Sequence, residues 1–333
     1  MKALGLTVTW RKNWRFWLGV SLSLVCLIWL MYSIDLAGVG TALMGMDYRL
    51  VFLATLLNLA NVLLRTVRWR LIFHTPHPPP FGRLASALLI GQSINILAPA
   101  RLGDLVRATL VGAGSTAYVL GTLVVELGLD LLMSAALVVL LLSRVTLPAW
   151  WRQSGQALLI AAAATLVAVG ALVVGRRWIA RVLEGLQSRW RHPLVQRVLT
   201  GGSQILRSLD ALRGPALLPV LTCSALIWAM YAAVNYALLG AVGERPSVLA
   251  ALFVLVVLLL GSAIPSSPGR IGVYHYLCIQ ALAVFGIGGA PALSYAIVLH
   301  LISVVMPIVL GVALAWRLGV SLRPSHETQM MES

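Results

Sequence analysis

Long apolar runs alternate with short polar segments along most of the chain. A transmembrane helix needs about 20 mostly apolar residues. The runs that approach this length predict six membrane-crossing helices, at 16–34, 50–64, 118–142, 156–174, 216–242 and 292–316. The pattern therefore predicts an all-α protein that crosses a bilayer several times.

Two further apolar regions are interrupted by proline and glycine. The run 84–98 is short and stops at a proline, and 105–113 follows it; the run 248–264 also stops at a proline, and 271–287 follows it. Proline and glycine close together interrupt a helix. Each pair is therefore expected either to re-enter the membrane and leave on the same side, or to span it. The first case gives about six full transmembrane helices plus two broken pairs, and the second gives eight crossings.

The two interruptions carry the same short motif. Residues 99–103 (Pro-Ala-Arg-Leu-Gly) and 268–272 (Pro-Gly-Arg-Ile-Gly) match by residue type, and their starts lie 169 positions apart (268 − 99). Broken segments at matching positions of two repeats are typical of transporters with a site near the bilayer midplane. If both pairs are re-entrant, the two halves form an inverted repeat. The expected organisation is one membrane domain (1–323) with repeat halves near 1–175 and 216–323, a basic amphipathic cytoplasmic segment (176–215) between them, and a disordered tail (324–333).

The composition agrees with a membrane protein and changes how the charge is interpreted. The chain is 60% hydrophobic and 11% charged, whereas a soluble domain has about 25% charged residues. The net charge is +15. Because the basic residues lie between apolar runs, they indicate topology and contacts with anionic lipid headgroups rather than nucleic-acid binding. The same rule predicts cytoplasmic termini in the cell (inner) membrane. The three cysteines lie in apolar segments and are expected to be packing residues.

Two basic segments allow more than one interpretation. Arg65, Arg68 and Arg70 follow an apolar run, so they are expected first to be a cytoplasmic flank and second a headgroup contact. Between 176 and 214, large apolar residues recur every four positions, with breaks expected at 192–193 and at the glycine pair 201–202. This segment is expected to lie on the cytoplasmic membrane surface or to fold against the bundle, and both can hold.

Charged residues within the apolar regions are the candidate functional residues, because a charge at membrane depth costs about 2.5–3.5 kcal/mol. Glu126 and Asp130 are four residues apart, so they share one helix face and need cationic or hydrogen-bonding partners. Arg101 and Arg107 are the expected partners. Arginine also fits phosphate oxygens, so the same residues could seat a lipid phosphate; the alternative is an ion pair that only stabilises the bundle.

The candidate residues fall into two groups. Predicted substrate-binding residues are Asn95, Arg101, Asp104, Arg107, Glu126, Asp130, Arg270 and His275. Predicted structural breaks are Pro99, Gly103, Pro265, Pro268, Gly269 and Gly272. His275 and His300 are each expected to be hydrogen-bonded packing residues before any mechanistic role. His74 and His77 have no third ligand nearby, so no metal site and no cofactor is expected.

Taken together, these motifs resemble the membrane region of the lysylphosphatidylglycerol synthase/flippase family. The resemblance rests on three segments, 95–107, 126–130 and 265–273, and covers nearly the whole chain. Two positions depart from the family pattern: Leu127 follows the glutamate where an arginine is usual, and His300 stands where the last span commonly has an arginine. These departures bear on the substrate and on the charge pairing.

The resemblance implies a role in moving a lipid, or a lipid-linked headgroup, between membrane leaflets. The first expectation is accordingly a flippase-like transporter of an anionic or modified lipid. The second is a non-catalytic accessory subunit that partners a lipid-modifying or glycosyl-transferring enzyme. An intramembrane enzyme ranks last, because no nucleophile–base pair is readable. Lysyl transfer by this chain alone is not expected. Membrane lipids are the expected partners, and nucleic acid is not.

Overall fold

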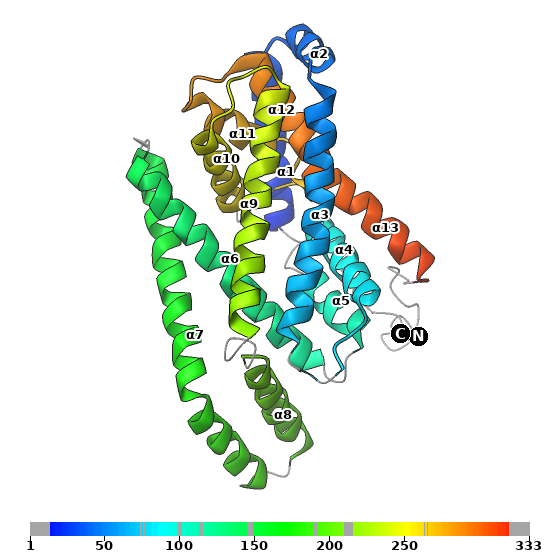
Figure 1. Cartoon of the computed structure of the whole chain (residues 1–333), viewed down its shortest axis with the longest axis vertical. Coiled ribbons are helices and arrows are strands. Elements are labelled where there is room, and N and C mark those ends of the chain that lie inside the picture. The colour runs from blue at the N-terminus through cyan, green and yellow to red at the C-terminus, as the bar shows by residue number, and fades with distance from the viewer. Residues whose placement is uncertain are drawn as a thin grey trace.

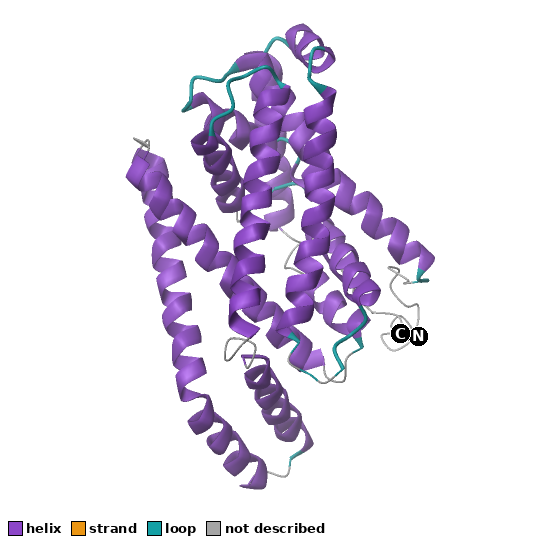
Figure 2. Ribbon diagram, in the orientation of Figure 1, coloured by secondary structure: helices purple, strands orange, loops and turns teal. Residues whose placement is uncertain are grey.

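The structure is a computed structural model, and it describes residues 14–73, 75, 77–98, 102–112, 116–144, 149–189, 192–209, 216–262, 264 and 266–319. Helices form nearly all of this part of the chain, and it contains no strand (Figure 2). The predicted sites at Pro99, Arg101 and Pro265 and the predicted tail lie outside the described residues. The helices are α1 (Trp14–Ser33), α2 (Leu36–Met44), α3 (Tyr48–Ile72), α4 (Phe81–Leu97), α5 (Leu102–Val111), α6 (Thr116–Arg144), α7 (Ala149–Arg189), α8 (Pro193–Ser208), α9 (Leu217–Ala241), α10 (Val248–Gly261), η4 (Pro268–Arg270), α11 (Val273–Ala283), α12 (Gly289–His300), η5 (Leu301–Val305) and α13 (Met306–Arg317).

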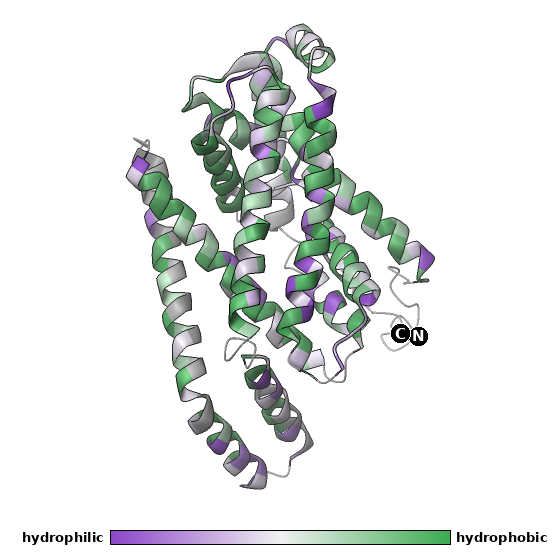
Figure 3. Ribbon diagram, in the orientation of Figure 1, coloured by the Kyte–Doolittle hydropathy of each residue, from purple (hydrophilic) through white to green (hydrophobic). Residues whose placement is uncertain are grey.

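Four described helices are long and apolar enough to cross a membrane. They are α3, α6, α9 and the continuous α12–η5–α13 helix, and α1 with α2 adds a fifth candidate that is bent by 87°. Two shorter apolar helices, α4 and α10, are the first helices of the two broken pairs. The prediction of an all-α membrane protein is therefore confirmed. Hydrophobic residues cover most of the bundle, while hydrophilic positions gather on α3 and α5 and at the lower end of α7 with α8 (Figure 3).

The first broken pair, α4–α5, folds as a helical hairpin. Arg83 in the first turn of α4 donates a hydrogen bond to the carbonyl of Val111 at the end of α5 (3.3 Å). Because the pair begins and ends at the same place, its two open ends face one end of the molecule, the lower end in Figure 1. A Cβ on Gly103 would overlap the carbonyl of Gly91. Only glycine allows α4 and α5 to approach this closely.

The second broken pair, α10–α11, is a hairpin of the opposite orientation. The ring of Phe253 in α10 packs edge-on against that of Phe285, which follows α11, with centroids 5.7 Å apart. The segments that enter and leave this pair lie at the upper end of the molecule in Figure 1. The two hairpins therefore open toward opposite ends.

The order of elements around the hairpins recurs along the chain. Helices α3 and α9 both have 25 residues, and their first residues lie 169 positions apart (217 − 48). Helix α6 and the α12–η5–α13 helix both have 29 residues. Helix α3 packs against α9, α4 against α13, and α10 against α6. Each hairpin thus contacts the last span of the other series, which is the arrangement an inverted repeat requires.

The basic segment after α6 differs from the prediction in one respect. Helix α7 continues without interruption from the apolar run into the basic region, and α8 begins at Pro193 after a break, as expected. The second predicted break, at Gly201–Gly202, is wrong, because both glycines lie inside α8. A Cβ on Gly201 would contact Ala117 of α6, and one on Gly202 would contact Leu183 of α7. Both glycines therefore lie on the sides of α8 that face α6 and α7, within a continuous helix.

Candidate functional site

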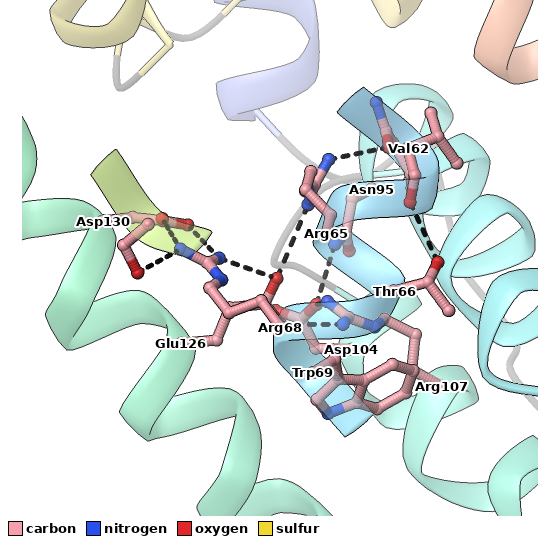
Figure 4. A network of polar contacts seen from close by, with 12 residues as sticks. Val62, Arg65, Thr66, Arg68, Trp69, Asn95, Asp104, Arg107, Glu126 and Asp130 are labelled. Carbon is pink, nitrogen blue, oxygen red and sulfur yellow. Dashed lines mark hydrogen bonds and ion pairs between the residues drawn. The ribbon is translucent and has the colours of Figure 1, made fainter. Parts of the chain in front are cut away.

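Helices α3 and α6 and the α5 arm of the first hairpin bring charged side chains together (Figure 4). Glu126 and Asp130 project from one face of α6, as their spacing predicts, and Arg68 of α3 bridges them. Its Nη1 is 2.6 Å from Oδ1 of Asp130, and its Nη2 is 3.2 Å from Oε1 of Glu126. Nη1 also donates to the hydroxyl of Ser224 on α9 (3.2 Å). The Arg68 side chain is fully buried.

Arg107 of α5 binds the other oxygen of Glu126. Its Nη2 lies 2.7 Å from Oε2 of Glu126, and its Nη1 lies 3.8 Å from Oδ1 of Asp104. The guanidinium stacks on the ring of Trp69 at 4.2 Å from the centroid, an arrangement that stabilises a cation. The indole Nε1 of Trp69 donates to Oγ1 of Thr122 (3.0 Å), which fixes the ring against α6.

Arg65 completes the ionic cluster, defined here as Arg65, Arg68, Asp104, Arg107, Glu126 and Asp130, and Asn95 lies next to it. Arg65 lies 3.7 Å from Oε1 of Glu126 and donates to the amide oxygen of Gln92 on α4 (3.0 Å). Asn95 of α4 donates to Oδ1 of Asp104 (3.0 Å), which ties the two arms of the hairpin together near its tip. The described cluster holds three arginines and three carboxylates, so its formal charge is balanced.

The second break has a strained backbone that packs tightly on α1. Gly269, Arg270 and Gly272 all have positive φ values (75°, 60° and 88°), and Arg270 is the one non-glycine residue of this kind among the described residues. The amide of Ser267 donates to Oγ of Ser23 on α1 (3.0 Å). A Cβ on Gly272 would overlap the carbonyl of Ser23. Glycine is therefore required at 272 by both conformation and space.

Aromatic and polar side chains connect this break to the last span. His300 ends α12 and donates from Nε2 to the carbonyl of Gly269 (2.8 Å). Its ring lies 4.9 Å from that of His275 and 5.0 Å from that of Tyr274. The hydroxyl of Tyr274 is 2.9 Å from that of Ser303, in the π-helical turn η5 that follows His300. His300 thus holds the second break in place.

The comparison with family models decides the identity at the family level. The model described as the lysylphosphatidylglycerol synthase TM region matches residues 16–311. The chain belongs to this family. The resemblance drawn from the three motifs is thereby confirmed. The comparisons with curated proteins and with solved structures found no match.

Within this family member, the structure groups only part of the predicted site. Asn95, Asp104, Arg107, Glu126 and Asp130 lie together at the first hairpin. Arg270 and His275 lie apart from them, at the second break. The two groups are nevertheless neighbours through one element, because η4 packs against α4, the helix that carries Asn95. Whether these residues bind a substrate stays a prediction.

One cationic partner of the carboxylates differs from the prediction. Arg107 does bind Glu126, but the arginine on Asp130 is Arg68, which the sequence predicts first as part of a cytoplasmic flank and which the structure buries between the two carboxylates. A signal for it exists in the sequence. Asn58, Asn61, Arg65 and Arg68 follow helical spacing along one side of an otherwise apolar helix. That side faces the bundle: Asn58 donates to the carbonyl of Ile302 and Asn61 to that of Ile227.

The arrangement limits the chemistry of the site. No group of three or more His, Cys, Asp or Glu side chains that could hold a metal ion occurs in the part of the chain that the structure describes. The three free cysteines, Cys26, Cys223 and Cys278, are buried, as expected of packing residues. Permanent cations, carboxylates and amides instead offer hydrogen bonds to a charged headgroup.

An apolar hollow lies elsewhere on the same pair of helices. Its volume is about 490 Å³, and almost all of its surface is apolar. It lies between the beginning of α3 and the end of α9, away from the charged residues. Its lining includes Leu50, Leu53 and Leu57 of α3 and Ala233, Tyr236 and Gly240 of α9.

Proposed function

We propose that this protein moves a lipid, or a lipid-linked headgroup, between the two leaflets of the cell inner membrane, and that the ionic cluster receives the headgroup. The observation that carries the proposal is the cluster itself: three arginines and three carboxylates lie together on the membrane-spanning helices α3 and α6 and on α5 of the first hairpin. Charged residues at membrane depth are expensive and in general mark a pathway or a binding site. The family, described by a lipid-synthase membrane region, supports a lipid as the substrate.

The distribution of contacts argues against a purely structural ion pair. One arginine would be enough to compensate Glu126, yet three guanidinium groups lie within 4 Å of it. Asp130 and Asp104 retain 33% and 27% side-chain exposure. The oxygens of these two carboxylates are therefore accessible and can still accept hydrogen bonds from a headgroup.

The two hairpins supply the geometry for access from both sides. They open toward opposite ends of the molecule (Figure 1) and contact each other through α4 and η4. In transporters with inverted repeats, such breaks meet near the midplane and the two halves rock around the site. We propose that the first hairpin opens to the cytoplasm, together with both chain termini, and the second to the outside.

Lipid exchange in proteoliposomes tests the proposal. Purified protein is reconstituted with fluorescent phospholipid, and a membrane-impermeant quencher reports how much of the label reaches the outer leaflet. We expect exchange with the wild type, strongly reduced exchange with Arg101→Ala and Arg270→Ala, and wild-type exchange with Arg70→Ala, which removes an exposed arginine of α3. The absence of exchange across anionic, zwitterionic and polyprenyl lipids would refute transport and favour the accessory-subunit alternative.

A further inference from the structure

Among the three arginines of the ionic cluster, one is placed differently from the others. We propose that Arg65, held by Gln92, is the residue that binds the phosphate of the lipid headgroup, while Arg68 and Arg107 serve to hold the carboxylates. This inference rests on the proposed function, because it names the headgroup contact of the same site. Arg65 lies in the segment for which a headgroup contact was the second expectation.

Arg68 and Arg107 already form hydrogen-bonded ion pairs with carboxylates. Arg68 binds Asp130 through two nitrogens (2.6 and 3.2 Å) and also Glu126, and its side chain is fully buried. Arg107 binds Glu126 at 2.7 Å, lies over Trp69, and is 7% exposed. Their Nε atoms have no acceptor among the described residues but are buried. A headgroup could reach these arginines only after a carboxylate had lost its partner.

Arg65 makes no hydrogen bond to any carboxylate that the structure describes. Its contact with Glu126, at 3.7 Å, is longer than a hydrogen bond and therefore electrostatic only. Its short contacts are with neutral groups, the amide oxygen of Gln92 at 3.0 Å and the hydroxyl of Tyr231. Its side chain is 17% exposed, the most of the three.

The consequence is a difference in cost between the arginines. If Arg65 turns to a phosphate, Glu126 keeps Arg68 on one oxygen and Arg107 on the other. If Arg68 or Arg107 turned instead, a buried carboxylate would lose a hydrogen bond, and leaving a buried charge uncompensated is strongly unfavourable. A phosphate would therefore recruit Arg65 first. The guanidinium offers a fork of donors that matches two phosphate oxygens.

Gln92 holds Arg65 in position and links it to α4 of the first hairpin. It lies in α4, one turn before Asn95 at the tip of the first hairpin. Its amide can accept from Arg65 while its NH₂ group can donate to a phosphate oxygen. Binding of a phosphate at Arg65 would thus act on α4 as well as on α3.

Lipid binding measured apart from transport tests this inference. Detergent-purified wild type, Arg65→Ala, Arg65→Lys and Arg70→Ala are titrated with phosphatidylglycerol and with diacylglycerol of the same chains, and bound lipid is read by native mass spectrometry. We expect Arg65→Ala to weaken phosphatidylglycerol binding about tenfold to a hundredfold, the value of a lost hydrogen bond to a charged group. Diacylglycerol binding and the thermal midpoint should stay at the Arg70→Ala values, and Arg65→Lys should be intermediate.

The outcomes separate this inference from the proposed function. Unchanged phosphatidylglycerol binding by Arg65→Ala would overturn it, and so would an equal loss for both lipids together with a lower thermal midpoint. If Arg65→Ala does not fold, the same criteria apply to Arg65→Lys. Selective binding by a wild type that exchanges no lipid would refute transport and leave the headgroup contact standing. If Arg65→Ala exchanges lipid and binds phosphatidylglycerol as the wild type does, transport is supported and the role of Arg65 in headgroup binding is refuted.

Discussion

The bridge between Arg68 and Asp130 provides the sharpest test of how the ionic cluster is stabilised. Arg68→Met keeps most of the side-chain length but removes the cation from both carboxylates. Breaking a buried pair by removing one partner costs about 3–5 kcal/mol. Asp130 is 33% exposed, and Glu126 keeps Arg107. We therefore expect the lower end, about 3 kcal/mol of lost unfolding free energy.

The second variant is Asp130→Asn, which removes the charge but keeps an oxygen that can accept from Arg68. We expect a loss of about 1 kcal/mol, near the net value of one hydrogen bond. In the double variant both charges of the bridge are absent, so neither is left uncompensated, and the loss should be about 2 kcal/mol. The resulting coupling energy is about −2 kcal/mol (2 − 3 − 1), within the range for residues of one network.

The assay is reversible denaturant unfolding in bicelles of the wild type, both single variants and the double variant. Arg70→Met combined with Asp130→Asn is the matched control, because Arg70 is an exposed arginine on the same helix. The control pair should be additive within about 0.5 kcal/mol. Additivity of the Arg68 and Asp130 variants within the same margin would refute the bridge as a stabilising contact.

Three further predictions concern the two hairpins. Gly103→Ala should destabilise the protein by about 2 kcal/mol or more, because its Cβ would overlap the backbone of α4. The control Gly82→Ala places its Cβ in open space and should leave stability unchanged. Equal thermal midpoints for the two variants would contradict the predicted overlap. His300→Leu should lower the unfolding free energy by about 1–3 kcal/mol, because it leaves the carbonyl of Gly269 without its donor. An unchanged unfolding free energy would show that this hydrogen bond does not stabilise the protein. In intact cells, an impermeant maleimide should label Gly288→Cys but reach Gly82→Cys only after lysis, and labelling of both from one side would refute the proposed orientation.

The sequence allowed the hairpins and the acidic half of the cluster to be predicted. Proline and glycine stop helices by local chemistry, so the interruptions of α4–α5 and α10–α11 could be read directly. Glu126 and Asp130 share a helix face because of their spacing alone. These inferences needed only residues that are close in the chain.

The cationic half of the cluster depends on long-range packing. Arg68 and Asp130 are 62 positions apart, and an arginine beside a tryptophan near the end of an apolar run also fits a cytoplasmic flank. The contact of His300 with Gly269 depends in the same way on how the last span packs. At Gly201 the local reasoning was wrong, since α8 continues through the glycine pair where its sides face α6 and α7.

The polar residues of α3 show that the repeat is not symmetric in chemistry. Their counterparts 169 positions later, in α9, are Ile227, Met230, Val234 and Ala237, all of them apolar. Helix α9 contributes instead the carbonyl of Ile227 and the hydroxyl of Ser224, which accept from Asn61 and Arg68. The charged site thus uses contacts between α3 and α9, which belong to two series of helices that match in length and order. Under the proposed function, a headgroup that leaves the ionic cluster meets a second hairpin of different chemistry, with histidine, tyrosine and serine side chains near Arg270. We then expect the two ends of the pathway to differ in headgroup affinity, and exchange assays on oriented protein should show unequal half-saturating lipid concentrations from the two leaflets.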